Sequence, residues 1–338
     1  MPLPRLVLTQ GDPAGIGPEI LLKLLAPGPP AGWRPLLIAE RSALDALRPS
    51  LPDFPWDRLR YVAGAVEEGD FIPDLIPILD PVGDRRSITL GASGLADAAG
   101  AMAALDAGIS LVRSGAADAL VTAPVSKESI ARHVLPGFKG HTDYLAEACG
   151  LERYGRDYLM AFLAPGLQVA LLNVHLPIRE ALDGIRGDTI AEALDCLHRH
   201  AGGKIALAGL NPHAGEGGLL GEEDGRILAP AVAAARERGL DVHGPESADS
   251  LFARARRGEF DWVLALYHDQ GLIAVKTAAF GLATNWTLGL PFLRTSVDHG
   301  TAFPLAGKGL ADEKPLAEVV EATLGLIAGR LPTKRLFP

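Results

Sequence analysis

Three short apolar runs, each followed by a polar loop with a histidine, constrain the fold of this chain more than any other feature. They are residues 168–172 before His175, residues 205–210 before His213, and residues 262–266 before His268. Short runs without polar alternation are typical of buried strands. In open α/β sheets ligands bind outside the carboxyl ends of the strands, where side chains from several strands can converge. The sequence therefore predicts an α/β fold with a candidate site at strand ends.

The three histidines suit a metal site. Neutral imidazole nitrogens are common ligands of divalent ions, and three of them leave coordination positions open for a substrate. Beside His213, the glycines at 215, 217 and 218 allow close backbone approach and unusual dihedral angles. The alternative interpretation is that each histidine only caps its strand with a hydrogen bond.

Composition excludes several classes of partner. The 338 residues carry a formal net charge of -9, which argues against nucleic acid and anionic membrane surfaces. Cys149 and Cys196 form no CxxC pattern, so a reducing compartment is the simplest setting. No signal peptide is apparent, and no segment reaches about 18 uninterrupted apolar residues, so we expect a cytoplasmic protein.

An anionic substrate must then be met by local cations. Lys276, Asn285 and Arg294 lie in what the sequence indicates is a stretch of turns and short apolar pieces. Lysine supplies a point charge and arginine a planar fork, which together suit a phosphate or a carboxylate. His141 and Thr142 stand at a predicted helix start, where backbone amides, a hydroxyl and an imidazole can face an anion. The alternatives are that Lys276 and Arg294 are solvated surface cations, and that Thr142 is an ordinary helix cap.

Residues 11–19, GDPAGIGPE, join a predicted strand at 6–9 to a helix with Pro18 in its first turn. Such a turn can cradle phosphate, but it does not fit the dinucleotide GxGxxG pattern, and a tight structural turn is an equal alternative. Helices are also predicted at 92–113, at 188–201 and at 222–238 with a kink at Pro230. The acids at 222–224 are interpreted as structural, and Asp249 as a helix cap or a site carboxylate.

Six motifs resemble the 4-hydroxythreonine-4-phosphate dehydrogenase (PdxA) family of vitamin B6 biosynthesis, in order and over nearly the whole chain. They are GDPAGIGPE at 11–19, TAPVSK at 122–127, GHTD at 140–143, NPHAGEGG at 211–218, YHDQG at 267–271 and TLGLPFLRTSVDHGTA at 287–302. The chain is also similar to the isocitrate and isopropylmalate dehydrogenase superfamily, through residues 15–19 and 299–309.

The resemblance implies an α/β/α subunit of two lobes, with the active site in the interlobe cleft and at a homodimer interface. One lobe, residues 1–125 plus 275–338, would carry the nucleotide loop and the termini. The middle lobe, residues 126–274, would carry most metal and dimer contacts. Nucleotide binding without a Rossmann fingerprint fits this superfamily.

The resemblance also implies roles for individual residues. The ligands of a divalent ion (zinc, magnesium or cobalt) would be His175, His213 and His268, the last from the other subunit. The substrate contacts would be His141, Thr142, Lys276, Asn285 and Arg294. The loop that holds the adenosine part of NAD would include His299, Gly300, Thr301 and Ala302. Pro304 and Trp286 depart from the Asp and Val that are frequent in the family.

The implied reaction is oxidation of the secondary alcohol of 4-phosphooxy-L-threonine by NAD or NADP, to a β-keto acid that loses carbon dioxide. Asp249 and Asp269 are candidates for the general base or for orienting metal ligands. The alternatives are a paralogue acting on erythronate 4-phosphate or a cyclic dihydrodiol dicarboxylate, a metal-dependent hydrolase, and a non-catalytic metal or sugar-phosphate binding protein.

Overall fold

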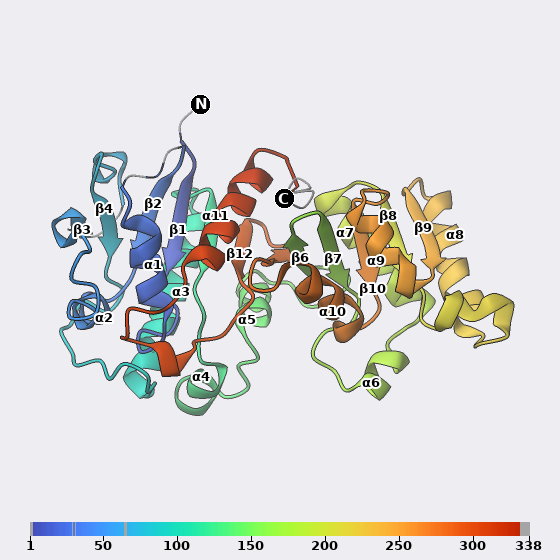
Figure 1. Ribbon diagram of the computed structural model, residues 1–338, viewed down its shortest axis with the longest axis horizontal. Coiled ribbons are helices and arrows are strands. Elements are labelled where there is room, and N and C mark those ends of the chain that lie inside the picture. The colour runs from blue at the N-terminus through green and yellow to red at the C-terminus, as the bar shows by residue number, and fades with distance from the viewer. Residues whose placement is uncertain (1–2, 29, 31, 64–65, 332–338) are drawn as a thin grey trace. The chain divides into compact units, whose positions relative to one another are not determined.

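The computed structural model describes residues 3–28, 30, 32–63 and 66–331 (Figure 1). The chain folds into two compact units, the first formed by Met1–Leu145 with Pro291–Gly329 and the second by Ala146–Leu290. The sequence placed these boundaries at 125/126 and 274/275. The terminal residues 1–2 and 332–338, assigned above to the lobe with the nucleotide loop, lie outside the described residues.

The first unit contains a parallel sheet. Its strands, in spatial order, are β3 (Leu59–Val62), β4 (Ile76–Leu79), β2 (Arg34–Ile38), β1 (Arg5–Thr9), β5 (Ala119–Thr122) and β12 (Leu293–Val297). Every pair in this part of the sheet is parallel. The chain runs from β1 to β2 on one side and reaches β5 on the other, so the strand order reverses between β1 and β5. Ligands bind at such a switch point in open α/β sheets.

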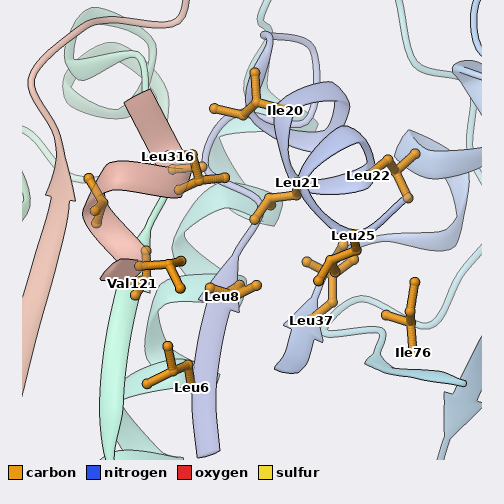
Figure 2. Packing of buried hydrophobic residues seen from close by; sticks show 14 of the residues in the cluster. Leu6, Leu8, Ile20, Leu21, Leu22, Leu25, Leu37, Ile76, Val121 and Leu316 are labelled. Atoms are coloured by element: carbon orange, nitrogen blue, oxygen red, sulfur yellow. The ribbon is translucent and has the colours of Figure 1, made fainter. Parts of the chain in front are cut away.

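Helices cover both faces of this sheet. They are α1 (Gly17–Leu25), α2 (Arg41–Ala46), α3 (Leu95–Arg113), α4 (Lys127–His133), α5 (His141–Ala148) and α11 (Lys314–Ile327). On one face, leucines of α1 and Leu316 of α11 pack on Leu6, Leu8 and Val121 (Figure 2). On the other, α3 approaches so closely that a Cβ at Gly108 would lie 2.8 Å from Leu120 Cδ1. Glycine allows this close approach, because the helix backbone lies directly against side chains of the strands.

Helix α3 is long and apolar enough to cross a membrane by length and composition. Of its apolar window, 56% is buried inside the fold. Its buried positions include Met102, Leu105 and Ile109, and it packs on β1 and β5. Core helices of this kind meet the same length and composition test.

The second unit contains a mixed sheet. Its spatial order is β11 (Thr284–Leu288), β6 (Leu159–Ala164), β7 (Leu167–Leu171), β10 (Trp262–Ala265), β8 (Ile205–Ala208) and β9 (Val242–Glu246). β11, β6 and β7 pair antiparallel, whereas β7, β10, β8 and β9 are parallel. Its helices are α6 (Ile178–Asp183), α7 (Gly187–Ala201), α8 (Ala229–Glu237), α9 (Ala248–Arg256) and α10 (His268–Ala279). The short helical turns of both units are η1 (Trp56–Arg58), η2 (Glu68–Asp70), η3 (Pro212–Gly218), η4 (Asp224–Leu228) and η5 (Phe303–Leu305).

The stretch after His268 differs from the sequence prediction. The turns predicted around Lys276 are wrong, because residues 268–279 form the single helix α10. Its buried residues Gly271, Leu272, Val275 and Ala279 follow helical spacing, but β-branched residues and a glycine obscure that period. Residues 284–288 become a strand because they pair antiparallel with β6, which also draws 275–290 into the second unit.

Candidate functional site

The three histidines follow three neighbouring strands of the second unit. β7 pairs parallel with β10, and β10 pairs parallel with β8, so the carboxyl ends of all three meet the same edge. His175 follows β7, His268 follows β10 as the first residue of α10, and His213 follows β8. The strand ends therefore stand as the sequence predicts.

Two of the three imidazoles lie side by side within one chain. The ring centroids of His175 and His268 are 5.5 Å apart. Two imidazoles on one tetrahedral ion, with metal–nitrogen bonds of about 2 Å, would have their ring centroids roughly 5–6 Å apart. Within the part of the chain that the structure describes, no three His, Cys, Asp or Glu side chains come together as one metal site. The pair thus fits part of an imidazole coordination shell.

Side-chain hydrogen bonds fix this pair. Asp269 Oδ1 lies 2.7 Å from His268 Nδ1, so the other ring nitrogen, Nε2, is the one available to a ligand. Such carboxylate contacts orient metal-ligating histidines and raise their basicity. Asn173 Nδ2 donates to the carbonyl of Leu266 at 3.0 Å and so joins the loop before His175 to the end of β10. Gln270 Nε2 donates at 2.8 Å to the carbonyl of Gly209, just past β8.

A cavity of about 400 Å³ opens beside the histidine pair. It is lined by His175, Leu176, Ile178, Ala181, Tyr267, His268 and Asp269. Its apolar side comes from α6 and the loop before it, and its polar side from the start of α10. A small polar ligand can therefore reach both imidazoles.

His213 is presented by a strained left-handed turn. Six consecutive residues, 213–218, have positive φ, with His213 at 54° and Glu216 at 45°. L-residues adopt this region at a cost, which the surrounding structure must offset. The buried carboxylate of Asp224 accepts from the backbone amides of Leu210 at 2.8 Å and Asn211 at 3.0 Å. The acid at 224 is thus structural, as the sequence indicated, and it anchors the start of the His213 turn.

Asp249 lies beside this turn, at the first turn of α9. The Ser247 hydroxyl donates to its Oδ1 at 2.6 Å. That hydrogen bond holds the pKa of Asp249 below its usual range, and the charge of His213 acts in the same direction. The carboxylate is therefore ionised at neutral pH, near the turn that carries His213.

The first unit contains a buried cation. Arg294, on β12, is only 1% exposed, and its Nη2 donates to Thr122 Oγ1 on β5 at 2.6 Å. Burial lowers its pKa to about 9, so the guanidinium remains charged at neutral pH. A charge taken out of water in this way favours an anionic ligand.

His141 begins α5 in the same unit. Its Nε2 is buried and has no hydrogen-bond partner among the described residues. Burial, followed by the charges of Arg294 and Lys127, lowers the pKa of His141 well below its usual value. The imidazole is therefore neutral at pH 7, and the adjacent Thr142 is 8% exposed.

The other two predicted substrate contacts belong to the second unit. Lys276 is exposed on α10. Asn285 is half-buried on β11, and its Oδ1 has no hydrogen-bond partner in the described part of the chain. Next to it, Trp286 is buried against Trp262, with ring centroids 6.1 Å apart, so the local packing accommodates the departure from valine.

The predicted nucleotide loop packs on the glycine-rich turn of the first unit. The carbonyl of Thr301 accepts from the amide of Ile16 at 3.0 Å, and Ala302 has a left-handed φ of 43°. A Cβ at Gly17 would lie 2.0 Å from the carbonyl oxygen of Gln10, so the turn needs glycine for its own packing. The alternative of a tight structural turn therefore accounts for this glycine. Pro304 lies in the exposed turn η5.

Sequence reasoning did not assign several residues that hold these sites. Asn173 and Gln270 connect strand ends in the second unit, and Thr122 holds Arg294 in the first. The charge of Lys127 contributes to the lowered pKa of His141. Thr122 and Lys127 belong to the TAPVSK motif, so the motif itself was the available signal.

The fold and the site define a class of protein. It is an α/β protein with an oriented pair of imidazoles at strand ends and a buried guanidinium group in a unit with a parallel sheet. The family model of the pyridoxal phosphate biosynthetic protein PdxA matches residues 33–323. The chain belongs to the PdxA family. The family and the α/β fold class predicted from the sequence are thereby confirmed.

Relatives and solved structures agree over nearly the full length. A 4-hydroxythreonine-4-phosphate dehydrogenase of Acidithiobacillus ferrooxidans is 40% identical over 344 residues, covering 97% of each chain. The crystal structure of the Klebsiella pneumoniae enzyme of that name is similar with a TM-score of 0.83 and 36% identity, covering 96% of this chain and 98% of its own. A terephthalate 1,2-cis-dihydrodiol dehydrogenase of Burkholderia xenovorans has a TM-score of 0.63 and 26% identity, covering 98% of this chain and 99% of its own.

Proposed function

We propose that this chain is a 4-hydroxythreonine-4-phosphate dehydrogenase of pyridoxal phosphate biosynthesis. The observation that carries the proposal is 40% identity over 97% of the chain to a relative with that name, within the PdxA family. The chain oxidises the secondary alcohol of 4-phosphooxy-L-threonine, and the resulting 2-amino-3-oxo-4-phosphooxybutanoate decarboxylates to 3-amino-2-oxopropyl phosphate. As a dehydrogenase it uses a nicotinamide cofactor, NAD or NADP, as hydride acceptor. Its free cysteines fit the expected cytoplasmic setting.

A divalent ion, zinc, magnesium or cobalt, would be held by His175, His213 and His268. When bound, such an ion eases loss of the hydroxyl proton and polarises the ketone. The 5.5 Å separation of the His175 and His268 rings and the Asp269 contact support this assignment. That separation favours His175 and His268 coming from one chain and His213 from a second copy. The resemblance alone implied that His268 crosses over.

The substrate's anionic groups would be held by a larger set of residues. It comprises His141, Thr142, Lys276, Asn285 and Arg294. The burial of the Arg294 guanidinium and the unpartnered His141 Nε2 support the first unit's share of this set. The buried Oδ1 of Asn285 supports the second unit's share. Fixing both ends of the substrate places its carbinol carbon for hydride transfer.

The adenosine part of the cofactor would rest on His299, Gly300, Thr301 and Ala302. The left-handed Ala302 and the hydrogen bond from Ile16 to Thr301 support a preformed loop. Of the two candidate carboxylates, Asp269 orients His268, so we assign it that role. Asp249, ionised and beside His213, is the better placed of the two to accept a proton.

A second copy of the chain would complete the site. Large apolar side chains are exposed on and beside α6 and α10: Leu176 (47%), Ile178 (53%), Leu182 (43%), Ile273 (66%) and Phe280 (84%). Exposed apolar surface of this kind is common at protein interfaces. Because α6 also lines the cavity beside His175, this surface lies next to the histidine pair. These features support the homodimer that the resemblance implies.

A substrate panel with NAD and NADP, in the presence of divalent metal, tests the proposal. We expect reduction of the nicotinamide with 4-phosphooxy-L-threonine and loss of turnover after chelation. The similarity to a dihydrodiol dehydrogenase favours one rival, a paralogue that oxidises a cyclic dihydrodiol dicarboxylate, and erythronate 4-phosphate belongs in the same panel. Turnover without any nicotinamide would instead indicate a metal-dependent hydrolase, and binding without turnover a non-catalytic protein.

A further inference from the structure

Lys127 is held over Gly140 at the start of α5. It is the first residue of α4, whose N-cap Ser126 accepts from the amide of Ser129 at 3.2 Å. A Cβ at Gly140 would lie 3.0 Å from Lys127 Cε and 3.3 Å from its Nζ. The lysine side chain therefore occupies the space that any larger residue at 140 would fill, and its ammonium group lies next to His141.

Three groups of the first unit thus share one location. The charges of both Lys127 and Arg294 act on the His141 imidazole. Arg294 is buried, whereas Lys127 is exposed. Solvent therefore reaches this location from the side of Lys127. Lys127 makes no hydrogen bond or ion pair among the described residues, although its neighbour Glu128 pairs with Arg132 at 2.7 Å. No acid on α4 thus neutralises this ammonium group.

We propose that Lys127 is a further substrate-binding residue, which together with Arg294 receives the phosphate group of the substrate. A phosphate dianion matches two cations better than a carboxylate does, because it carries about twice the negative charge and still has a free oxygen for lysine once arginine has bound two as a fork. The neutral His141 and the Thr142 hydroxyl complete the set of donors without further charge. The inference rests on the proposed function for the identity of the natural ligand, but not for the presence of the site.

Binding of inorganic phosphate, measured by calorimetry on the whole protein without substrate or cofactor, tests the site directly. We expect Lys127→Gln to weaken phosphate binding by roughly 10- to 100-fold, the usual loss for one charge-assisted contact. Lys127→Arg keeps the charge and should retain most of the affinity. Lys139→Gln removes an exposed lysine from the same α4–α5 connection and should bind phosphate as the wild type does.

Wild-type affinity in Lys127→Gln, an equal loss in Lys139→Gln, or no phosphate binding by the wild type would each overturn the inference. Phosphate binding that depends on Lys127, in a protein that reduces no nicotinamide with any substrate of the panel, would sustain the site and refute the proposed function. The two failures are therefore distinguishable.

Steady-state kinetics then separates phosphate from carboxylate recognition. We expect Lys127→Gln to raise the KM for 4-phosphooxy-L-threonine by roughly 10-fold or more, with a smaller change in kcat. The KM for unphosphorylated 4-hydroxythreonine should stay within about 2-fold, because that substrate has no phosphate to lose contact with. Equal losses for both substrates would assign Lys127 to the carboxylate and overturn the phosphate assignment.

Discussion

Asp269 is one residue after His268, and its Oδ1 lies 2.7 Å from the Nδ1 of that histidine. Its side chain is 73% exposed, so it adds little to core packing. We expect Asp269→Ala to weaken zinc binding by about 10- to 100-fold, because the imidazole loses its orienting partner, while the melting temperature stays unchanged. Zinc affinity is measured by competition with a chromophoric chelator.

The chain offers a matched control for this variant. Asp241 makes a similar exposed contact with His243, at 2.8 Å, away from the histidine pair. Asp241→Ala should leave zinc affinity unchanged. If both variants bind zinc as the wild type does, Asp269 has no role in orienting a metal ligand.

Arg294 is a buried charge, and its proposed role in substrate binding would come at a cost in stability. Burying a charge is costly, and an apolar residue of similar volume in its place is often neutral or stabilising. We therefore expect Arg294→Met to keep the free energy of unfolding within about 1 kcal/mol of the wild type, or to raise it. Arg294→Ala should lose about 2–4 kcal/mol through the cavity that it leaves.

Both Arg294 variants should raise the substrate KM by about 10-fold or more, because each loses one charge-assisted contact with the substrate. Urea unfolding and steady-state kinetics measure the two effects on the same preparations. An unchanged KM in Arg294→Met would remove Arg294 from the anion site, whatever its stability.

At the scale of elements, the His213 turn depends on a carboxylate eleven positions later in the sequence, Asp224. Its oxygens accept from two backbone amides and from Asn211 Nδ2 at 2.9 Å. Asp224→Asn puts an amide NH₂ where an acceptor is needed, so we expect a loss of about 1–3 kcal/mol of stability. Metal-dependent turnover should fall as well, although His213 itself is retained.

Glu223→Gln is the matched control for the His213 turn. Glu223 is exposed, and its Oε2 accepts from Asn211 Nδ2 at 2.8 Å. A glutamine oxygen can still accept this bond, so stability and turnover should both be preserved. Equal turnover in the two variants would mean that the turn does not need Asp224 to present His213.

The elements with a strong local signal were predictable, and those fixed by distant partners were not. The strands before His175, His213 and His268 are short apolar runs with glycine, proline or asparagine beyond them, and the structure has them within one or two residues. The strand β11 could not be predicted in the same way, because TNWTL becomes a strand only by pairing with β6. Helix α10 was missed because its buried stripe contains Gly271 and Val275, which are poor helix formers.

The candidate site divides in the same way. Residue type and position at a strand end indicate His175 and His268, but their separation depends on which strands are neighbours in the sheet. Other features follow only from the folded chain. They are the burial of Arg294, its hydrogen bond to Thr122 (172 positions earlier in the sequence), and the His141 Nε2 that has no hydrogen-bond partner among the described residues. The proposed role of Lys127 depends on the space left beside Gly140, which has no side chain. No local sequence pattern reveals that contact.

At the scale of the whole molecule, the proposed chemistry requires groups from both units. The imidazoles, Lys276 and Asn285 belong to the second unit, and Arg294, His141, Lys127 and the nucleotide loop belong to the first. Neither unit alone carries both a metal ligand set and the cofactor loop. A fragment of either unit is therefore expected to lack dehydrogenase activity.

A metal site shared between two copies makes a prediction about mixtures of inactive chains. His213→Ala and His268→Ala should each abolish metal-dependent turnover and leave the fold intact, because both imidazoles are solvent-accessible and carry little core packing. Co-expressed in equal amounts, the two variants should recover about a quarter of wild-type activity. Half of the dimers are then mixed, and in each mixed dimer one of the two sites has all three histidines. No recovery in dimers shown to be mixed would mean that each site draws both residues from one chain.

A second mixture decides which histidine crosses to the other copy. If His175 and His268 act from the same chain, as their 5.5 Å ring separation favours, then mixing His175→Ala with His268→Ala chains leaves every site damaged. Activity should then remain at the level of the single variants, whereas the pair His213→Ala with His175→Ala should recover about a quarter. Recovery in the His175 and His268 mixture would instead assign these two ligands to different copies, with His268 crossing as the family resemblance implies. Differently tagged chains, purified by both tags in sequence, give only mixed dimers, in which the recovery expected of a complementing pair rises from about a quarter to about half.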